Sequence, residues 1–227
     1  MKERIKKDTA VLFGIILFTG ILFQFPGLYP QNFFLDGILE FLGLGAVLMG
    51  TLFRMSGRAH KKARSEQGHG LVTTGPYALI RNPMYLGTFL IGSGFILLVW
   101  PWYLWPVFAV LFFLRFHAQI RKEEVYLQKI FGKPYELYTQ KTPALIPRWK
   151  DGKGLHLHHI FPPEEIWSTK ERNAIFFLPL LVVLLEIGQQ QIVFGVAPWG
   201  RIISVFTIAL AAFGLAIFVS LRNDNPA

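Results

Sequence analysis

The chain has 227 residues, of which 52% are hydrophobic and only 16% are charged, and its mean hydropathy is +0.40. Soluble domains carry about 25% charged residues, so this composition excludes an ordinary soluble domain and indicates a membrane protein. The chain has no cysteine, which excludes disulfides, thiolate nucleophiles and cysteine-ligated metals. Its net charge of +9 fits either nucleic-acid binding or membrane orientation, and the distribution of the charge decides between them.

Six apolar segments are candidates for transmembrane helices, since a bilayer core of about 30 Å requires about 20 apolar residues. In chain order they are Thr9–Phe25, Phe33–Phe53, Pro83–Trp100, Tyr103–His117, Ala174–Phe194 and Ile202–Leu221. The first also resembles a signal peptide, but Gln24-Phe25-Pro26 is not a small-residue cleavage site, so we expect it to remain. The sequence therefore predicts an all-α, polytopic bundle of about six transmembrane helices.

Lysine and arginine gather on one side of this predicted bundle. Four lie before the first segment, six in residues 54–81, eleven in residues 115–172 and one after the last segment, so only Arg201 falls on the other side. The positive-inside rule then places both termini and both long loops in the cytoplasm. Membrane orientation explains the basic charge without nucleic acid, and the short loops and lack of targeting signals favour a prokaryotic inner membrane.

A first polar patch lies at the start of the third segment. Gly75-Pro76 is a turn signal, and Asn82-Pro83 is typical of an N-cap followed by proline at the first helical position. A helix N-terminus attracts anions, and Arg81 just before it can pair with a carboxylate through two hydrogen bonds. Tyr77 and Tyr85 flank this point. The alternative for Arg81 is a simple anchor at the membrane surface.

A second polar patch lies beyond the fourth segment. We expect this helix to continue from Tyr103 to Ile130, because Gly132 followed by proline is the first stop signal. Its last turns then leave the membrane and carry Arg121, Glu123 and Glu124. The alternative is a solvated face with a surface pair between Arg121 and Glu124, worth only about 0.3–0.5 kcal/mol.

A short connection between the third and fourth segments makes them antiparallel neighbours. The beginning of one and the end of the other must then lie on the same side of the membrane, so we expect Arg81 to approach Glu124. One patch favours an anion and the other offers carboxylates for a cation. Together they fit a molecule that carries both charges.

The chain resembles the isoprenylcysteine carboxyl methyltransferase family over about residues 40–148, and phospholipid methyltransferases share the general pattern. The residues that carry the resemblance are Leu71-Val72-Thr73, Gly75-Pro76-Tyr77, Arg81-Asn82-Pro83-Met84-Tyr85-Leu86-Gly87, Glu123-Glu124, Leu127, Phe131-Gly132, Tyr135, Tyr138 and Ile146-Pro147. The resemblance implies S-adenosylmethionine as methyl donor, bound in a cytoplasmic pocket, and a lipophilic acceptor such as an isoprenylcysteine carboxylate.

The resemblance also implies which residues form the site. The implied cofactor-binding residues are Gly75, Tyr77, Arg81, Asn82, Pro83, Tyr85, Glu123 and Glu124. The implied catalytic residues are Arg121, Glu123 and Glu124, with Arg115 as the alternative arginine. Asn82 stands where the family has histidine, and an amide cannot titrate as a base near neutrality. Open alternatives are a phospholipid amine methyltransferase, a small-thiol methyltransferase and a non-catalytic membrane scaffold.

These features divide the chain into four predicted parts. They are an N-terminal hairpin (1–54), a methyltransferase core (55–150), a polar linker (151–173) and a C-terminal hairpin (174–227). We expect no metal site, because the histidines of His156-Leu157-His158-His159 have no partners elsewhere and are typical of a solvated linker. Glu186 lies within the fifth segment and is either structural or functional. The oligomeric state stays open.

Overall fold

The computed structural model describes residues 13–30, 32–65, 70–148, 160–167 and 174–195, together with 199, 200, 203 and 207. Regular structure in this part of the chain is entirely helical, which confirms the all-α prediction. The elements after the first helix are η1 (Pro26–Leu28), α2 (Phe33–Arg64), α3 (Pro76–Leu79), α4 (Pro83–Val99), η3 (Trp102–Leu104), α5 (Trp105–Phe131), α6 (Lys133–Lys141), α8 (Pro163–Trp167) and α9 (Ala174–Phe194).

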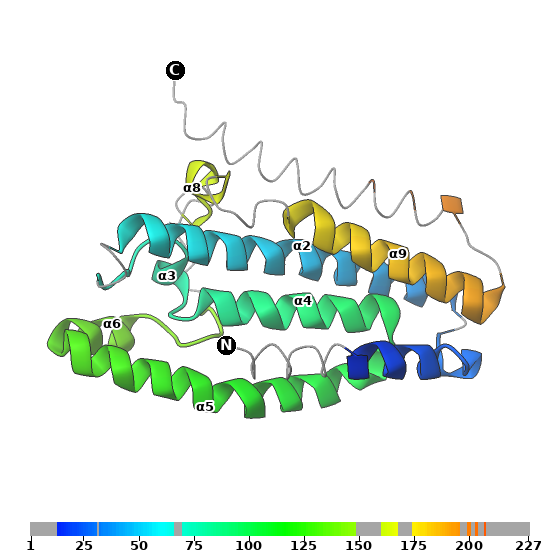
Figure 1. The fold of residues 1–227 in the computed structure, drawn as a ribbon, viewed down its shortest axis with the longest axis horizontal. Helices are drawn as coiled ribbons and strands as arrows, with labels where there is room; N and C mark the ends of the chain where they lie inside the picture. Colours follow the sequence, from blue (N-terminus) through cyan, green and yellow to red (C-terminus); the bar gives the residue numbers. More distant parts are fainter. Residues whose placement is uncertain are drawn as a thin grey trace, which may run out of the picture.

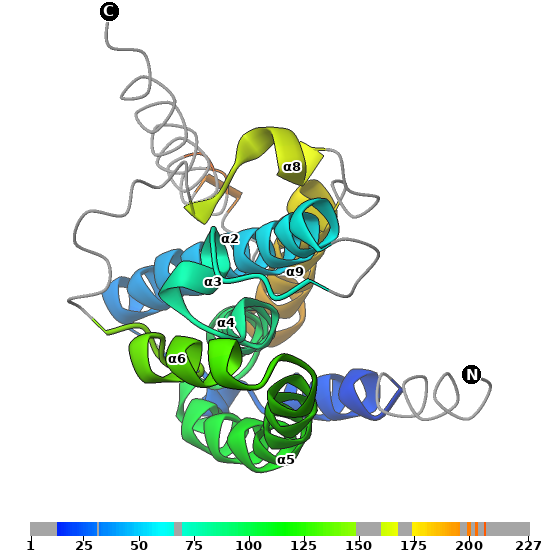
Figure 2. The same cartoon turned by 90° about the vertical axis from the view of Figure 1, so that its left-hand side faces the viewer.

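Helices α2 and α4 form the centre of the fold and lie side by side (Figure 1). They run antiparallel and approach closely through glycines: a Cβ atom at Gly87 would lie only 2.5 Å from the carbonyl oxygen of Gly50. Small residues let helix backbones approach in this way inside membranes. Helix α9 packs against both helices, whereas α5 and α8 lie on opposite sides of the α2–α4 pair (Figure 2).

Two helical stretches of the described chain, Phe34–Arg64 and Trp102–Phe131, are long and apolar enough to cross a membrane. Shorter apolar helices span Phe13–Leu22, Pro83–Val99 and Phe177–Val193. Large apolar side chains of α5 face outward, with Leu114 71% exposed and Leu111 60% exposed. An apolar surface of this extent needs lipid or a partner, so a membrane bundle fits the structure, while the number of six spans stays a prediction.

Helix α2 is longer than the apolar segment Phe33–Phe53 that we predicted to span the membrane. It begins at Phe33 behind Asn32, whose side chain accepts hydrogen bonds from the backbone N–H groups of Phe34 and Leu35, and it continues past Phe53 to Arg64. The predicted boundary followed the loss of apolar residues, which ends a membrane span but not a helix. The basic residues after Phe53 are good helix formers, so the helix extends beyond the apolar region.

The other predicted helices agree closely with the structure where it describes them. Helix α9 has the predicted bounds, and α5 extends to Phe131, just before the glycine stop. On α9, Glu186 is 4% exposed, and the side chain of Gln190 donates to Asp36 of α2 at 3.4 Å. The histidines of the linker and almost all of the sixth segment lie outside the described residues.

The short helix α8 packs against the C-terminal part of α2. His60 Nδ1 lies 2.7 Å from Glu165 Oε2, and Ser56 Oγ donates to the carbonyl oxygen of Ile160 at 2.8 Å. Because the other ring nitrogen of His60 contacts Thr74 Oγ1 at 2.9 Å, the same side chain also fixes the segment that leads into α3.

Candidate functional site

A tight turn at Gly75 begins the candidate site. Gly75 has a φ of +61°, and a Cβ atom there would lie 2.8 Å from the His60 ring, so both backbone and space require glycine. The following helix α3 is fixed by two tyrosines. Tyr77 donates to the carbonyl oxygen of Gly57 at 3.1 Å, and Tyr138 donates to the carbonyl oxygen of Tyr77 at 2.6 Å. These bonds tie α3 to both α2 and α6.

The segment after α6 crosses the start of α4. The backbone N–H groups of Arg81 and Asn82 donate to the carbonyl oxygens of Pro143 and Ala144 at 2.9 and 3.1 Å. Asn82 occupies the predicted N-cap position, but its side chain does not cap the helix and instead donates to Ala144 at 3.0 Å. The predicted helix start is confirmed, with Asn82 at the N-cap position and Pro83 at the first helical position, although the Asn82 side chain makes no cap hydrogen bond.

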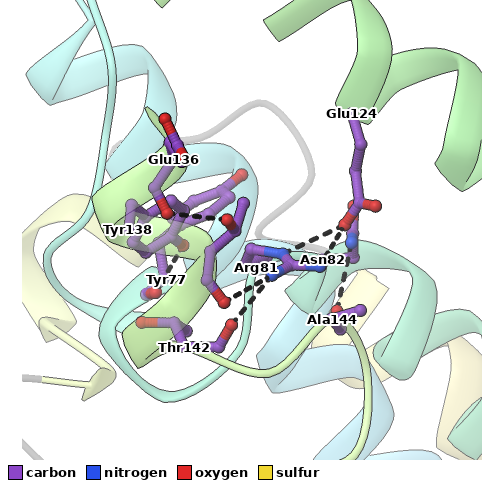
Figure 3. A network of polar contacts seen from close by, with 9 residues as sticks. Tyr77, Arg81, Asn82, Glu124, Glu136, Tyr138, Thr142 and Ala144 are labelled. Carbon is purple, nitrogen blue, oxygen red and sulfur yellow. Dashed lines mark hydrogen bonds and ion pairs between the residues drawn. The ribbon is translucent and has the colours of Figure 1, made fainter. Parts of the chain in front are cut away.

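Arg81 and Glu124 meet as predicted (Figure 3). Nε and Nη2 of Arg81 donate to Glu124 Oε1 at 3.0 and 2.6 Å, and Nη1 donates to the carbonyl oxygens of Thr139 and Thr142 at 3.0 and 3.1 Å. The two side chains are only 14% and 25% exposed. Arginine has five N–H donors, so one on Nη2 remains, and Glu124 Oε2 forms no hydrogen bond within the described residues.

This contact also changes the expected electrostatics. The sequence places an anion-binding cation and a cation-binding carboxylate on the same side of the bundle, with room for a ligand between them. In the structure the two charges bind one another directly. The arginine therefore orients the carboxylate and joins α4, α5 and α6, while one oxygen of Glu124 stays available to accept from a ligand.

A cavity of about 660 Å³ lies beside this ion pair, between the end of α5 and α6. It is lined by Arg81, Glu124, Val125, Gln128, Lys129, Tyr135 and Thr139. Burial, followed by the charge of Glu124, raises the pKa of Tyr135 to about 12, so this phenol is neutral at physiological pH. The cavity thus combines a carboxylate, cations, amide and hydroxyl groups and an aromatic ring.

Glu123 belongs to a separate polar group on the neighbouring face of α5. Its Oε1 accepts hydrogen bonds from the hydroxyl of Tyr85 at 2.6 Å and from Gln119 Nε2 at 3.1 Å. The ring of Phe116 packs against Tyr85 with centroids 5.3 Å apart. This group connects α4 and α5 next to the cavity but does not line it.

The remaining predicted residues lie outside the cavity and stabilise the segments that carry Arg81. Pro83 is fully buried and faces Gly57 of α2, where a Cβ atom would lie 3.1 Å from Pro83 Cγ. Tyr77 is 9% exposed and its hydroxyl points to α2. Gly75 and Asn82 shape the backbone. None of these four side chains lines the cavity, whereas Arg81 and Glu124 do.

The two candidate arginines of α5 differ in their surroundings. Arg121 is exposed and forms no hydrogen bond or ion pair within the described part of the chain, so the surface pair with Glu124 is absent. Arg115 is also exposed, but its guanidinium carbon lies 5.8 Å from the Phe116 ring centroid. The charge of Arg115 also acts on Tyr85 of the Tyr85–Glu123 pair.

Several residues of the cavity and its surroundings were not predicted from the sequence. Helical spacing alone could have found Gln119, which lies one turn before Glu123. It could also have found Gln128, one turn after Glu124. The roles of Lys129 and Thr139 depend on how α6 folds back after Gly132, which has a φ of +55°. No local pattern gives the direction of that turn.

Comparisons with known proteins point to one family. Residues 38–134 match the family described as phospholipid methyltransferase. The chain is 30% identical over 141 residues to protein-S-isoprenylcysteine O-methyltransferase B of Arabidopsis thaliana, covering 61% of this chain and 72% of that protein. It is 33% identical over 112 residues to protein-S-isoprenylcysteine O-methyltransferase of Schizosaccharomyces pombe, covering 48% of each chain.

A relative with a different description is also similar. The chain is 30% identical over 154 residues to the cobalt-zinc-cadmium resistance protein CzcN of Cupriavidus metallidurans, covering 65% of this chain and 66% of that protein. No solved structure matches the chain significantly.

Proposed function

Because the chain belongs to the family of isoprenylcysteine and phospholipid methyltransferases, we propose that this integral membrane protein transfers a methyl group from S-adenosylmethionine to a lipophilic acceptor. The observation that carries the proposal is the Arg81–Glu124 contact beside a cavity of about 660 Å³. The leading acceptor is an isoprenylcysteine-like carboxylate. We keep a phospholipid amine and a small thiol as alternative acceptors.

The cavity suits the proposed cofactor in size and chemistry. Small-molecule pockets measure about 300–1,000 Å³, and this cavity falls within that range. The free oxygen of Glu124 can accept from an ammonium group. Lys129 and the remaining N–H of Arg81 can hold a carboxylate.

S-adenosylmethionine, when bound, supplies an electrophilic methyl group on a sulfonium sulfur. The protein must then align the acceptor and exclude water, and alignment alone can contribute about 7–11 kcal/mol. The Tyr85–Glu123 pair lies next to the cavity and is placed to hold the acceptor. For an amine or thiol, Glu123 would take the proton, because Asn82 cannot.

The type of acceptor decides what the cationic residues do. A carboxylate acceptor is already a nucleophile and needs a cation to orient it. Arg115 is better placed for this role than Arg121, because its guanidinium lies near Phe116, whose ring packs against Tyr85, and its charge acts on Tyr85. We extend the proposal to six transmembrane helices in a prokaryotic inner membrane, with the cavity and both termini in the cytoplasm.

A non-catalytic scaffold is the second candidate function. One observation favours it: similar proteins include some that are described as metal-resistance proteins and not as methyltransferases. A scaffold would keep the fold without needing the cofactor. Absence of S-adenosylmethionine binding in well-folded protein would support it.

Transfer of a labelled methyl group tests the proposal directly. Purified protein is given labelled S-adenosylmethionine with prenylcysteine analogues, extracted membrane lipids or small thiols in separate reactions. We expect label in one class of acceptor and a large loss in Glu124→Gln. Glu136→Gln is the matched control, since Glu136 is an exposed acid of α6 outside the cavity. No transfer to any of the three classes would contradict the proposal.

A further inference from the structure

Arg54 is a partly buried cation that the proposed mechanism does not use. It lies on α2, and its Nη1 donates to the hydroxyl of Thr88 on α4 at 2.7 Å. No carboxylate forms an ion pair or hydrogen bond with Arg54 among the described residues. A guanidinium has five N–H donors, so four remain after this bond. A cation removed from water with only a neutral partner favours an anion nearby.

The position of Arg54 is fixed by packing. Its stem crosses α4 at Gly87, where a Cβ atom would lie 2.6 Å from Arg54 Cγ. The Thr88 hydroxyl uses its single hydrogen to donate to the carbonyl oxygen of Met84 at 2.9 Å, so it must accept from the arginine. The guanidinium is therefore held in one orientation before any ligand arrives.

The Arg54 guanidinium lies too deep in the bundle to be an ordinary anchor at the membrane surface. An anchoring arginine extends its side chain toward the membrane surface, which here is the end where α4 begins. Arg54 instead bonds to Thr88, five residues inside α4 from Pro83. At 1.5 Å per residue, the bond lies about 7–8 Å deeper than the start of α4, where Arg81 stands.

The flank of α4 on which Arg54 meets Thr88 also carries Tyr85, which belongs to the Tyr85–Glu123 pair. On α4, Gly87 faces α2 and Phe89 packs against α5, so Thr88 lies between these two contacts. Arg54 and Thr88 are half-buried and Met84 is 36% exposed, so this flank is accessible. Tyr85 lies three residues before Thr88 and therefore shares its side of the helix, one turn nearer the cavity.

We propose that Arg54, oriented by Thr88, binds the acidic group of the methyl acceptor. This inference rests on the proposed methyltransferase function. The ligand is an amphiphile that carries a carboxylate or phosphate in addition to its methyl-accepting group, as the phospholipid amine alternative does, and it enters from the lipid side along α4. Its methyl-accepting atom lies nearer the polar end, beside Tyr85 and Glu123. Arg54 is thus an anion subsite about one helical turn from the Tyr85–Glu123 pair.

Binding of simple amphiphiles tests this assignment without knowledge of the natural acceptor. The full chain is placed in bilayers of neutral phosphatidylcholine, and binding of labelled dodecyl phosphate, dodecanoate and dodecanol is measured. We expect Arg54→Gln to weaken dodecyl phosphate and dodecanoate about tenfold or more, since charged hydrogen bonds are strong. Thr88→Val should weaken them about threefold, and dodecanol should bind equally to all variants.

Matched controls separate this site from general surface charge and from the cofactor site. Lys61→Gln removes an exposed cation two turns further along α2 and should change binding less than twofold. S-adenosylmethionine affinity should be unchanged in Arg54→Gln. If no variant binds S-adenosylmethionine, the proposed function fails, while the dodecyl phosphate result still decides whether Arg54 is an anion site.

Two results would overturn the inference. One is equal binding of dodecyl phosphate to folded wild-type protein and Arg54→Gln. The other is saturation of the site by bulk phosphatidylglycerol, measured as loss of dodecyl phosphate binding when that lipid is mixed into the bilayer. The second result would assign Arg54 to a structural lipid instead of the acceptor. Weak competition by phosphatidylglycerol supports the acceptor assignment.

Discussion

Glu124→Gln removes the charge of the cavity carboxylate with almost no change in shape. The amide oxygen can still accept from Nε and Nη2 of Arg81, so the contacts at 3.0 and 2.6 Å have a replacement partner. Because the ion pair is partly exposed, we expect a loss of unfolding free energy of no more than about 1 kcal/mol. The second oxygen of Glu124, which we assign to the cofactor ammonium, becomes an NH₂ group that cannot accept.

The cofactor should respond much more strongly than the fold. A hydrogen bond to a charged group contributes about 1.5–3 kcal/mol, which corresponds to about 10- to 150-fold in affinity. The Glu124 side chain is 25% exposed, so we expect the lower part of this range, about tenfold or more. Titration calorimetry with S-adenosylmethionine measures the change, with Glu136→Gln as control. Affinity within twofold of wild type would refute the assignment of Glu124.

Three further variants test other parts of the site. Arg81→Ala should lose cofactor affinity and also about 2 kcal/mol or more of stability, because two carbonyl oxygens lose their donor; thermal unfolding and calorimetry together check this. Glu123→Gln should slow methylation of an amine or thiol about 100-fold or more, with little change in cofactor affinity, as measured by single-turnover transfer. The pKa of Tyr135 is raised to about 12, so its stabilising contribution should be present below pH 10 and lost between about pH 10 and 12. Tyr135→Phe should therefore flatten the fall of melting temperature over that range, and an unchanged fall would contradict the burial argument.

Local signals in the sequence predicted the elements that bring the site together. The glycine after Phe131 gave the end of α5, and the proline at position 83 gave the start of α4. The short connection between these helices then predicted that Arg81 and Glu124 are neighbours. The structure confirms these inferences. They could be made from the sequence because they depend only on local helix signals and on the direction of the chain.

Local helix signals could not predict the hydrogen bonds between residues that are far apart in the sequence. The sequence could not show that Arg81 and Glu124 bind one another, because that depends on the carbonyl oxygens of Thr139 and Thr142 fixing the guanidinium. It also could not show that Asn82 donates to Ala144 instead of capping α4. In both cases the chain after α6 folds back across α4, and only tertiary packing defines that path.

Photo-crosslinking with labelled S-adenosylmethionine tests the central claim most directly. The protein is irradiated in detergent with the labelled cofactor, and the labelled peptides are mapped. We expect label between the end of α5 and α6, in residues 119–141, and its loss when S-adenosylhomocysteine competes. Competed label that maps only to other parts of the chain would contradict the proposed cofactor site, and so would a lack of competed label in folded protein.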